Sequence, residues 1–156
     1  MAQRPPSVAT APNERLSQLA RRHLLIGWLG LLVFLTLGLV LEGLHGLKVD
    51  FYLDTRASTR RLMWTLAHAH GTLLSLVQIA FAVSIVRVTS LTEKAANWAS
   101  RGLLGGLTLL PLGFLLGGLK LYGGDPGPGI ILVPAGALML LVGVGVFVRA
   151  LLKNKF

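Results

Sequence analysis

Four long apolar runs, separated by short polar segments, dominate the pattern of hydrophobic and polar positions along this chain. The runs cover about 24–46, 62–86, 102–119 and 130–148. Residues 24–41 contain no charged side chain, and about 20 apolar residues are enough to cross the hydrocarbon core of a bilayer. The pattern predicts an all-α fold, in which four transmembrane helices form a membrane-embedded four-helix bundle.

The polar segments divide the chain around this core. We expect residues 1–22 to be a mostly disordered cytoplasmic tail, with a short surface helix over 13–22, residues 23–152 to be the transmembrane domain, and residues 153–156 to be a second tail. Ser90 and Glu93 have the spacing of a capping box and predict a helix start there. The segment YGGDPGPG at 122–129 predicts a tight turn, and Pro111 predicts a kink in the third span.

Composition supports a membrane environment. Hydrophobic residues make up 53% of the chain and charged residues 13%, against about 25% charged residues in soluble domains. The net charge of +9 lies in clusters that flank the apolar runs, which is typical of membrane helices and not of a nucleic-acid surface. The absence of cysteine excludes disulfides, thiolate metal sites and covalent c-type haem.

The distribution of Lys and Arg predicts the orientation, because cytoplasmic segments carry the excess of positive charge. The two tails and the second connection hold ten basic residues, and the first and third connections hold five. We therefore expect both termini on the cytoplasmic side. We also expect the membrane to be the cytoplasmic membrane of a bacterium.

Glycines in the third span predict a helix-packing face. Gly102, Gly106, Gly113 and Gly117 fall on one stripe of the helix, and small residues let membrane helices approach closely. The stripe predicts either packing within this chain or an interface with another membrane subunit.

Ionisable residues inside apolar runs are expensive and mark candidate sites. Glu42 and His45 lie late in the first span, and His68 and His70 lie early in the second. His23 follows Arg21 and Arg22, so we expect it at the cytoplasmic boundary. The topology places Glu42, His45 and His68 at a common depth, since Glu42 lies roughly 6 Å below the outer end of its span.

Helical phase separates the two histidines of the second span. Glu42 and His45 share a face because they are three residues apart. His68 continues a polar stripe formed by Arg61, Thr65, Thr72 and Ser75. His70 points about 160° away from His68. We therefore expect Glu42, His45 and His68 to face one another, with His70 serving a different neighbour.

Three kinds of chemistry fit these residues. Glu42, His45 and His68 are a plausible ligand set for a divalent metal such as Zn, Fe or Cu. Alternatively, His45 with His68 or His70 could ligate a b-type haem. The third interpretation is structural, with Glu42 hydrogen-bonded to a histidine and no cofactor.

The segment WTLAHAHGTLL at 64–74 resembles histidine-bearing helices of haem-containing membrane subunits, although no family motif is complete. We therefore predict a small membrane subunit of a respiratory or redox complex with an outward-facing His/Glu site. The alternatives are a structural or assembly subunit without cofactor and, third, a small transporter. The sequence indicates no catalytic residue and no nucleic-acid partner.

Overall fold

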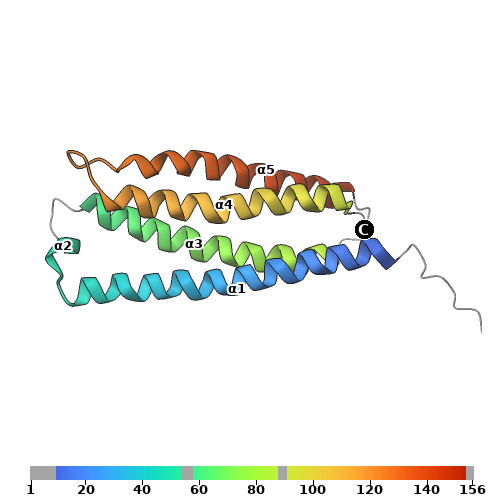
Figure 1. Ribbon diagram of the computed structural model, residues 1–156, viewed down its shortest axis with the longest axis horizontal. Helices are drawn as coiled ribbons and strands as arrows, with labels where there is room; N and C mark the ends of the chain where they lie inside the picture. The colour runs from blue at the N-terminus through green and yellow to red at the C-terminus, as the bar shows by residue number, and fades with distance from the viewer. Residues whose placement is uncertain (1–9, 54–57, 88–90, 154–156) are drawn as a thin grey trace, which may run out of the picture.

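The computed structural model describes residues 10–53, 58–87 and 91–153. In this part of the chain the elements are α-helices and one 3₁₀ helix, in the order α1 Thr10–Gly46, α2 Asp50–Leu53, α3 Ser58–Ile85, α4 Glu93–Leu119, η2 Pro128–Ile131 and α5 Leu132–Lys153 (Figure 1). The helices α1, α3, α4 and α5 are long and apolar enough to cross a membrane. The predicted all-α fold with four such helices is confirmed.

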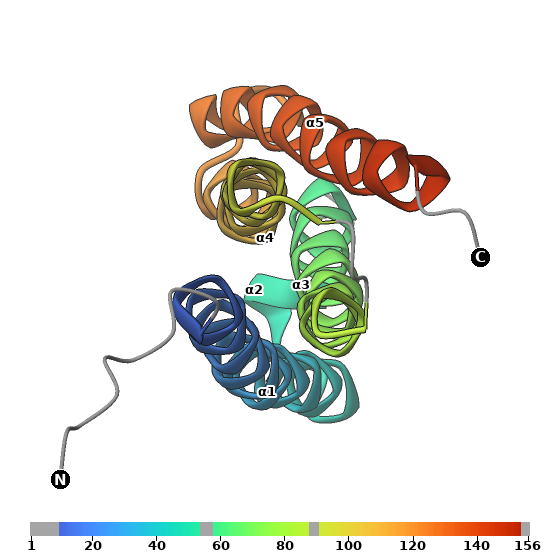
Figure 2. The same ribbon diagram turned by 90° about the vertical axis from the view of Figure 1, so that its right-hand side faces the viewer.

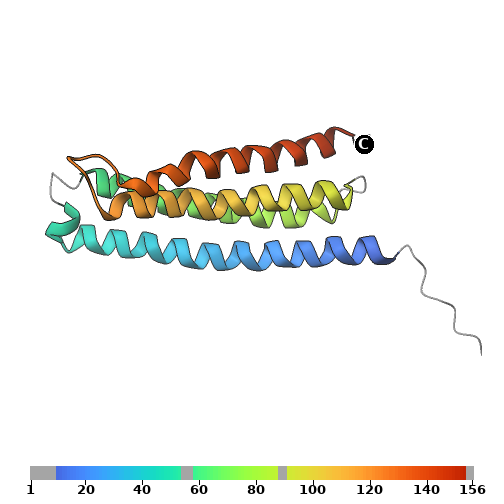
Figure 3. The same cartoon turned by 45° about the horizontal axis from the view of Figure 1, so that its top comes forward.

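The four long helices lie antiparallel in a bent row, α1–α3–α4–α5, with α3 and α4 inside and α1 and α5 outside (Figures 2 and 3). Within the described residues α1 and α5 do not pack against one another, so the row is open and the bundle is not a closed ring. We call the end at which α1 begins and α5 finishes the N-terminal end, and the other end, which carries α2 and η2, the opposite end (Figure 1).

The first helix is longer than its predicted span. α1 begins at Thr10, so the segment 13–22 belongs to the same helix as the first apolar run and is not a separate helix. Its 37 residues give a length of roughly 55 Å, well beyond the roughly 30 Å of hydrocarbon in a bilayer. The remainder of the predicted disordered tail, residues 1–9, lies outside the described residues, as does 154–156.

The start of α4 differs from the predicted capping box. Thr92 is the N-cap residue, and its side-chain oxygen accepts a hydrogen bond from the Ala95 amide at 3.3 Å. Ser90 lies outside the described residues. The helix then continues through Pro111, which is buried.

The predicted tight turn after α4 is confirmed. Tyr122 and Asp125 exchange two backbone hydrogen bonds of 3.0 Å each. The two residues between them, Gly123 and Gly124, have φ angles of 61° and 98°. Because side chains other than hydrogen are strained at such positive φ angles, the two glycines allow the chain to reverse here.

The glycine face of α4 is occupied by the same chain. A Cβ atom at Gly102 would lie 2.6 Å from the Gly143 Cα atom, and one at Gly113 would lie 2.8 Å from a Val133 methyl group. Gly106 lies against Leu140, and Gly117 lies against Ile130 of η2. α5 and η2 pack on this face, as the interpretation of packing within this chain predicts. An interface with another subunit here stays a prediction.

The interface between α1 and α3 also pairs small residues with larger ones. Gly27 contacts Ile79, Gly30 contacts Ser75, and Gly71 of α3 receives the ring of Phe34. Such close approach supplies dispersion contacts. These contacts drive the association of helices in a membrane, because lipid tails are as apolar as the side chains and there is no hydrophobic driving force. The same interface positions His68, which lies against Gly38.

Candidate functional site

His68 faces α1 from the middle of α3. Its Nδ1 atom is 2.7 Å from the carbonyl oxygen of Phe34, and its ring lies over the notch left by Gly38. A carbonyl oxygen can only accept, so Nδ1 carries the proton and donates it. His68 therefore links α3 to the backbone of α1.

Glu42 and His45, the other predicted members of the metal set, are exposed on α1 near the opposite end. No hydrogen bond or ion pair joins either of them to His68 within the described part of the chain. A search of the same residues finds no cluster of three or more His, Cys, Asp or Glu side chains that could hold a metal ion. The structure thus does not bring Glu42, His45 and His68 together, and metal binding by this set stays a prediction.

His70 points to the other side of α3, as helical phase predicts. Its Nδ1 atom lies 2.9 Å from the carbonyl oxygen of Leu66 in its own helix. Its ring centre lies 5.0 Å from that of Phe114 in α4. His68 and His70 consequently contact different helices and belong to different environments.

The hydrogen bonds of His68 and His70 leave the same atom of each ring available. In both residues Nδ1 bonds to a backbone carbonyl, which fixes the tautomer and leaves a lone pair on Nε2. For neither residue is a hydrogen bond to Nε2 found among the described residues. Each ring can therefore accept one further partner through Nε2, separately from the other.

The most extensive network of side-chain hydrogen bonds between the described helices surrounds His23, which was not predicted to be a site. His23 is fully buried, with no exposed surface, and lies between α3 and α4 at the N-terminal end. Its Nδ1 atom lies 2.5 Å from Oε1 of Gln78, and its Nε2 atom lies 2.8 Å from Oγ of Ser100. The burial of His23 between helices, where both ring nitrogens bond to side chains of other helices, was not predicted. Its expected position at the cytoplasmic boundary of the membrane stays a prediction.

The geometry of this network assigns its protons. Nε2 of Gln78 donates to the Leu103 carbonyl at 2.9 Å, which turns the amide oxygen toward His23. An amide oxygen only accepts, so Nδ1 of His23 donates to it, and Nε2 accepts from the Ser100 hydroxyl. His23 is thereby a neutral imidazole whose hydrogen-bonding capacity is complete.

The network connects three helices that are far apart in sequence. His23 belongs to α1, Gln78 to α3, and Ser100 with Leu103 to α4. The edge of the His23 ring also packs against Phe81, with ring centres 4.7 Å apart. Leaving any of these polar atoms unpaired away from water costs about 1–3 kcal/mol, so the set favours one arrangement of the three helices. We call His23, Gln78 and Ser100 the polar lock.

A signal for the polar lock was present in the sequence. Gln78 continues the polar stripe of α3 by one further helical step, because it lies three residues after Ser75. His23 lies at the beginning of its span and Gln78 near the end of the next, so antiparallel helices bring them to one depth. Ser100 carried no comparable signal, since small residues such as serine are common wherever membrane helices pack together.

At the opposite end the polar contacts go mainly to backbone carbonyls. Arg60 donates to the Gly118 carbonyl at 3.1 Å and to the Phe51 carbonyl at 2.9 Å. The indole of the buried Trp64 donates to the Leu115 carbonyl at 3.1 Å. These contacts connect α3 to α2 and α4 without involving Glu42 or His45.

Comparison with known proteins adds no assignment to this geometry, since no family model, curated protein or solved structure matches the chain.

Proposed function

We propose that this chain is a small multi-pass membrane subunit with a structural or assembly role, in which the intramembrane polar groups hold the helices together. The observation that carries the proposal is the polar lock, in which both nitrogens of the buried His23 bond to side chains of two other helices. The Nδ1 atoms of His68 and His70 are likewise bonded to backbone carbonyls of this chain. His23 and His68 thus bond to other helices, whereas His70 bonds within α3 and contacts α4 through the ring of Phe114.

The proposed arrangement in the membrane has both termini in the cytoplasm of a bacterial cell. Four apolar helices support a multi-pass protein, and the ten-to-five distribution of basic residues supports this orientation. A reporter fused after Phe156 is expected to be active only as a cytoplasmic fusion. Activity of a periplasmic reporter at that position would contradict the proposed orientation.

Absorbance spectroscopy and metal analysis on one detergent-purified sample test the structural role. We expect no Soret band and no stoichiometric metal, together with a marked loss of thermal stability in His23→Ala. A Soret band or one equivalent of metal that disappears in a histidine variant would contradict the proposal.

A second candidate, axial ligation of a b-type haem by His68 or His70, is favoured by one specific observation. Each residue donates Nδ1–H to a carbonyl and keeps an Nε2 lone pair, which is the usual arrangement of a histidine ligand. Because the two rings face different helices, only one of His68→Ala and His70→Ala should remove a Soret band. For the metal set, His68→Ala should abolish occupancy, Glu42→Ala and His45→Ala should weaken it strongly, and His70→Ala should matter less.

A further inference from the structure

Two adjoining cavities lie beside the first turns of α4 at the N-terminal end. One, of about 440 Å³, is lined by Glu93, Lys94, Asn97, Trp98 and Arg101. The second, of about 270 Å³, is lined by Trp98, Arg101, Gly102, Leu138, Met139 and Val142. Trp98 and Arg101 line both, so a polar cavity continues into an apolar groove between α4 and α5.

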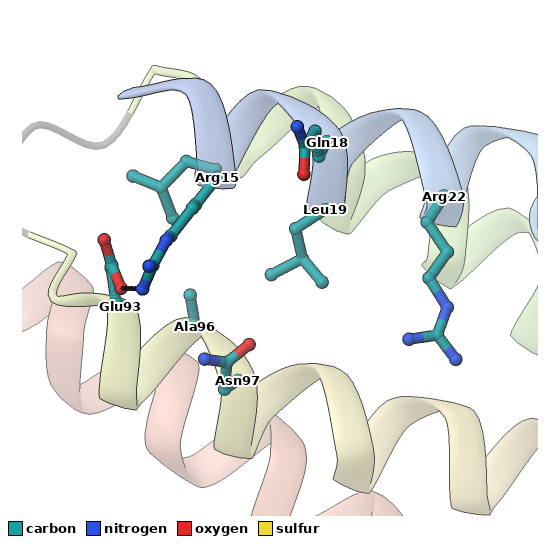
Figure 4. Close-up of a pocket in the computed structure, with 8 residues that line it drawn as sticks. Arg15, Gln18, Leu19, Arg22, Glu93, Ala96 and Asn97 are labelled. Carbon is teal, nitrogen blue, oxygen red and sulfur yellow. Dashed lines mark hydrogen bonds and ion pairs between the residues drawn. The ribbon is translucent and has the colours of Figure 1, made fainter. Parts of the chain in front are cut away.

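The polar cavity has an excess of positive charge. Lys94 and Arg101 are exposed on it. Its carboxylate, Glu93, is already paired with Arg15 of α1 at 3.0 Å (Figure 4). Since that ion pair offsets the negative charge, the basic groups of Lys94 and Arg101 remain available to an anion.

A neighbouring cavity of about 280 Å³ is also lined by basic side chains. It lies between α1 and α4 and shares Glu93 and Asn97 with the polar cavity. Figure 4 shows Arg22 of α1 extending toward α4 on the side of this space away from the Arg15–Glu93 pair. The region around Asn97 is therefore approached by basic side chains from two helices.

The groove has the opposite character. Leu138, Met139 and Val142 of α5 form one wall and are all exposed. Gly102 of α4 lines the groove and packs closely against the backbone of Gly143 in α5, because neither residue has a side chain. Trp98 lines both cavities, and the Arg101 guanidinium lies 6.0 Å from the centre of its ring. Aromatic and basic residues at this position are typical of the level of lipid headgroups.

We propose that these two cavities bind one anionic phospholipid, with its phosphate held by Arg101 and Lys94 and one acyl chain lying in the groove between α4 and α5. Charge complementarity selects the occupant, because basic pockets beside membrane helices attract anionic headgroups. The groove adds an apolar surface next to the headgroup position, which an acyl chain can contact and a free anion cannot. This inference is independent of the structural role proposed above.

Native mass spectrometry of the purified protein from vesicles of equal parts phosphatidylglycerol and phosphatidylcholine tests the site. The wild-type protein is expected to retain one phosphatidylglycerol in preference to phosphatidylcholine. Arg101→Gln should weaken this retention about fivefold, as expected for a basic residue worth about 1 kcal/mol at a membrane surface. Val142→Trp, which narrows the groove, should also weaken retention of phosphatidylglycerol.

Arg149→Gln is the matched control, because Arg149 is an exposed arginine of α5 that lines neither cavity. Its retention of phosphatidylglycerol should equal that of the wild type. An equal loss in Arg149→Gln and Arg101→Gln would overturn the site in favour of general surface charge. Equal retention of both lipids in all variants would overturn it in favour of non-specific annular lipid. Displacement of the lipid by millimolar inorganic phosphate would overturn the role of the groove.

Discussion

The two ends of this helical row use polar residues in different ways. At the N-terminal end the polar lock is buried, and its side chains bond to one another across three helices. At the opposite end Arg60 and Trp64 bond to backbone carbonyls, whereas Glu42 and His45 are exposed on α1. Polar side chains of similar chemistry thus have a packing role at one end and remain open to their surroundings at the other.

The difference shows that an ionisable residue in a membrane span is not by itself evidence of a cofactor. The cost of burying such a group can be offset by hydrogen bonds to other helices. His23 illustrates this, because its two nitrogens are satisfied by neutral partners. Glu42 and His45 are exposed on α1 and make no such bonds to His68 among the described residues.

The largest expected loss of stability comes from substituting Gly102, a tightly packed glycine at the N-terminal end, compared with Gly117 near the opposite end. Gly102→Leu should destabilise the protein by about 3 kcal/mol, because even a Cβ there would overlap Gly143 and the Met139 carbonyl. Thermal unfolding in detergent measures the change. Gly117→Ala is the control, since its Cβ would lie 3.6 Å from the nearest atom, and a similar loss there would contradict the tighter packing at Gly102.

The second prediction compares two histidines of α1. His23→Ala should lower the free energy of unfolding by about 2 kcal/mol, because Gln78 and Ser100 lose their buried partner. His45→Ala should leave stability almost unchanged, as His45 is exposed. Unfolding by an increasing concentration of a denaturing detergent measures both free energies. Equal losses of stability in the two variants would contradict the contrast between the ends.

A smaller loss is expected when only one bond of the polar lock is removed. Ser100→Ala deletes the hydroxyl that donates to His23 Nε2 and should cost about 1 kcal/mol. The same unfolding assay applies. A loss equal to that of His23→Ala would mean that Ser100 stabilises α4 independently of His23.

The smallest effect concerns the opposite end. Trp64→Phe keeps an aromatic ring but removes the indole bond to the Leu115 carbonyl, and should cost about 0.6 kcal/mol, the average for hydrogen bonds measured between membrane helices. A loss above that of His23→Ala would show that the opposite end is the more strongly coupled one.

The long helices and the opposed directions of His68 and His70 could be predicted because hydrophobic runs and helical phase depend on residues near in sequence. Which face of α1 meets α3 could not be predicted. The open row leaves Glu42 and His45 exposed and places Phe34 and Gly38, not these two residues, against His68. The hydrogen bonds of His23 were not predicted, because its partners Gln78 and Ser100 belong to other helices that are distant in the sequence.

A double-mutant cycle between His23 and Gln78 tests most directly whether the polar lock holds the helices together. Unfolding free energies are measured for the wild type, His23→Ala, Gln78→Ala and the double variant, since the cycle isolates the energy shared by the pair. We expect a coupling of about 1 kcal/mol, with the double variant less destabilised than the sum of the single variants. Strictly additive losses would contradict the account, because they would mean that the bond between these side chains contributes nothing to helix association.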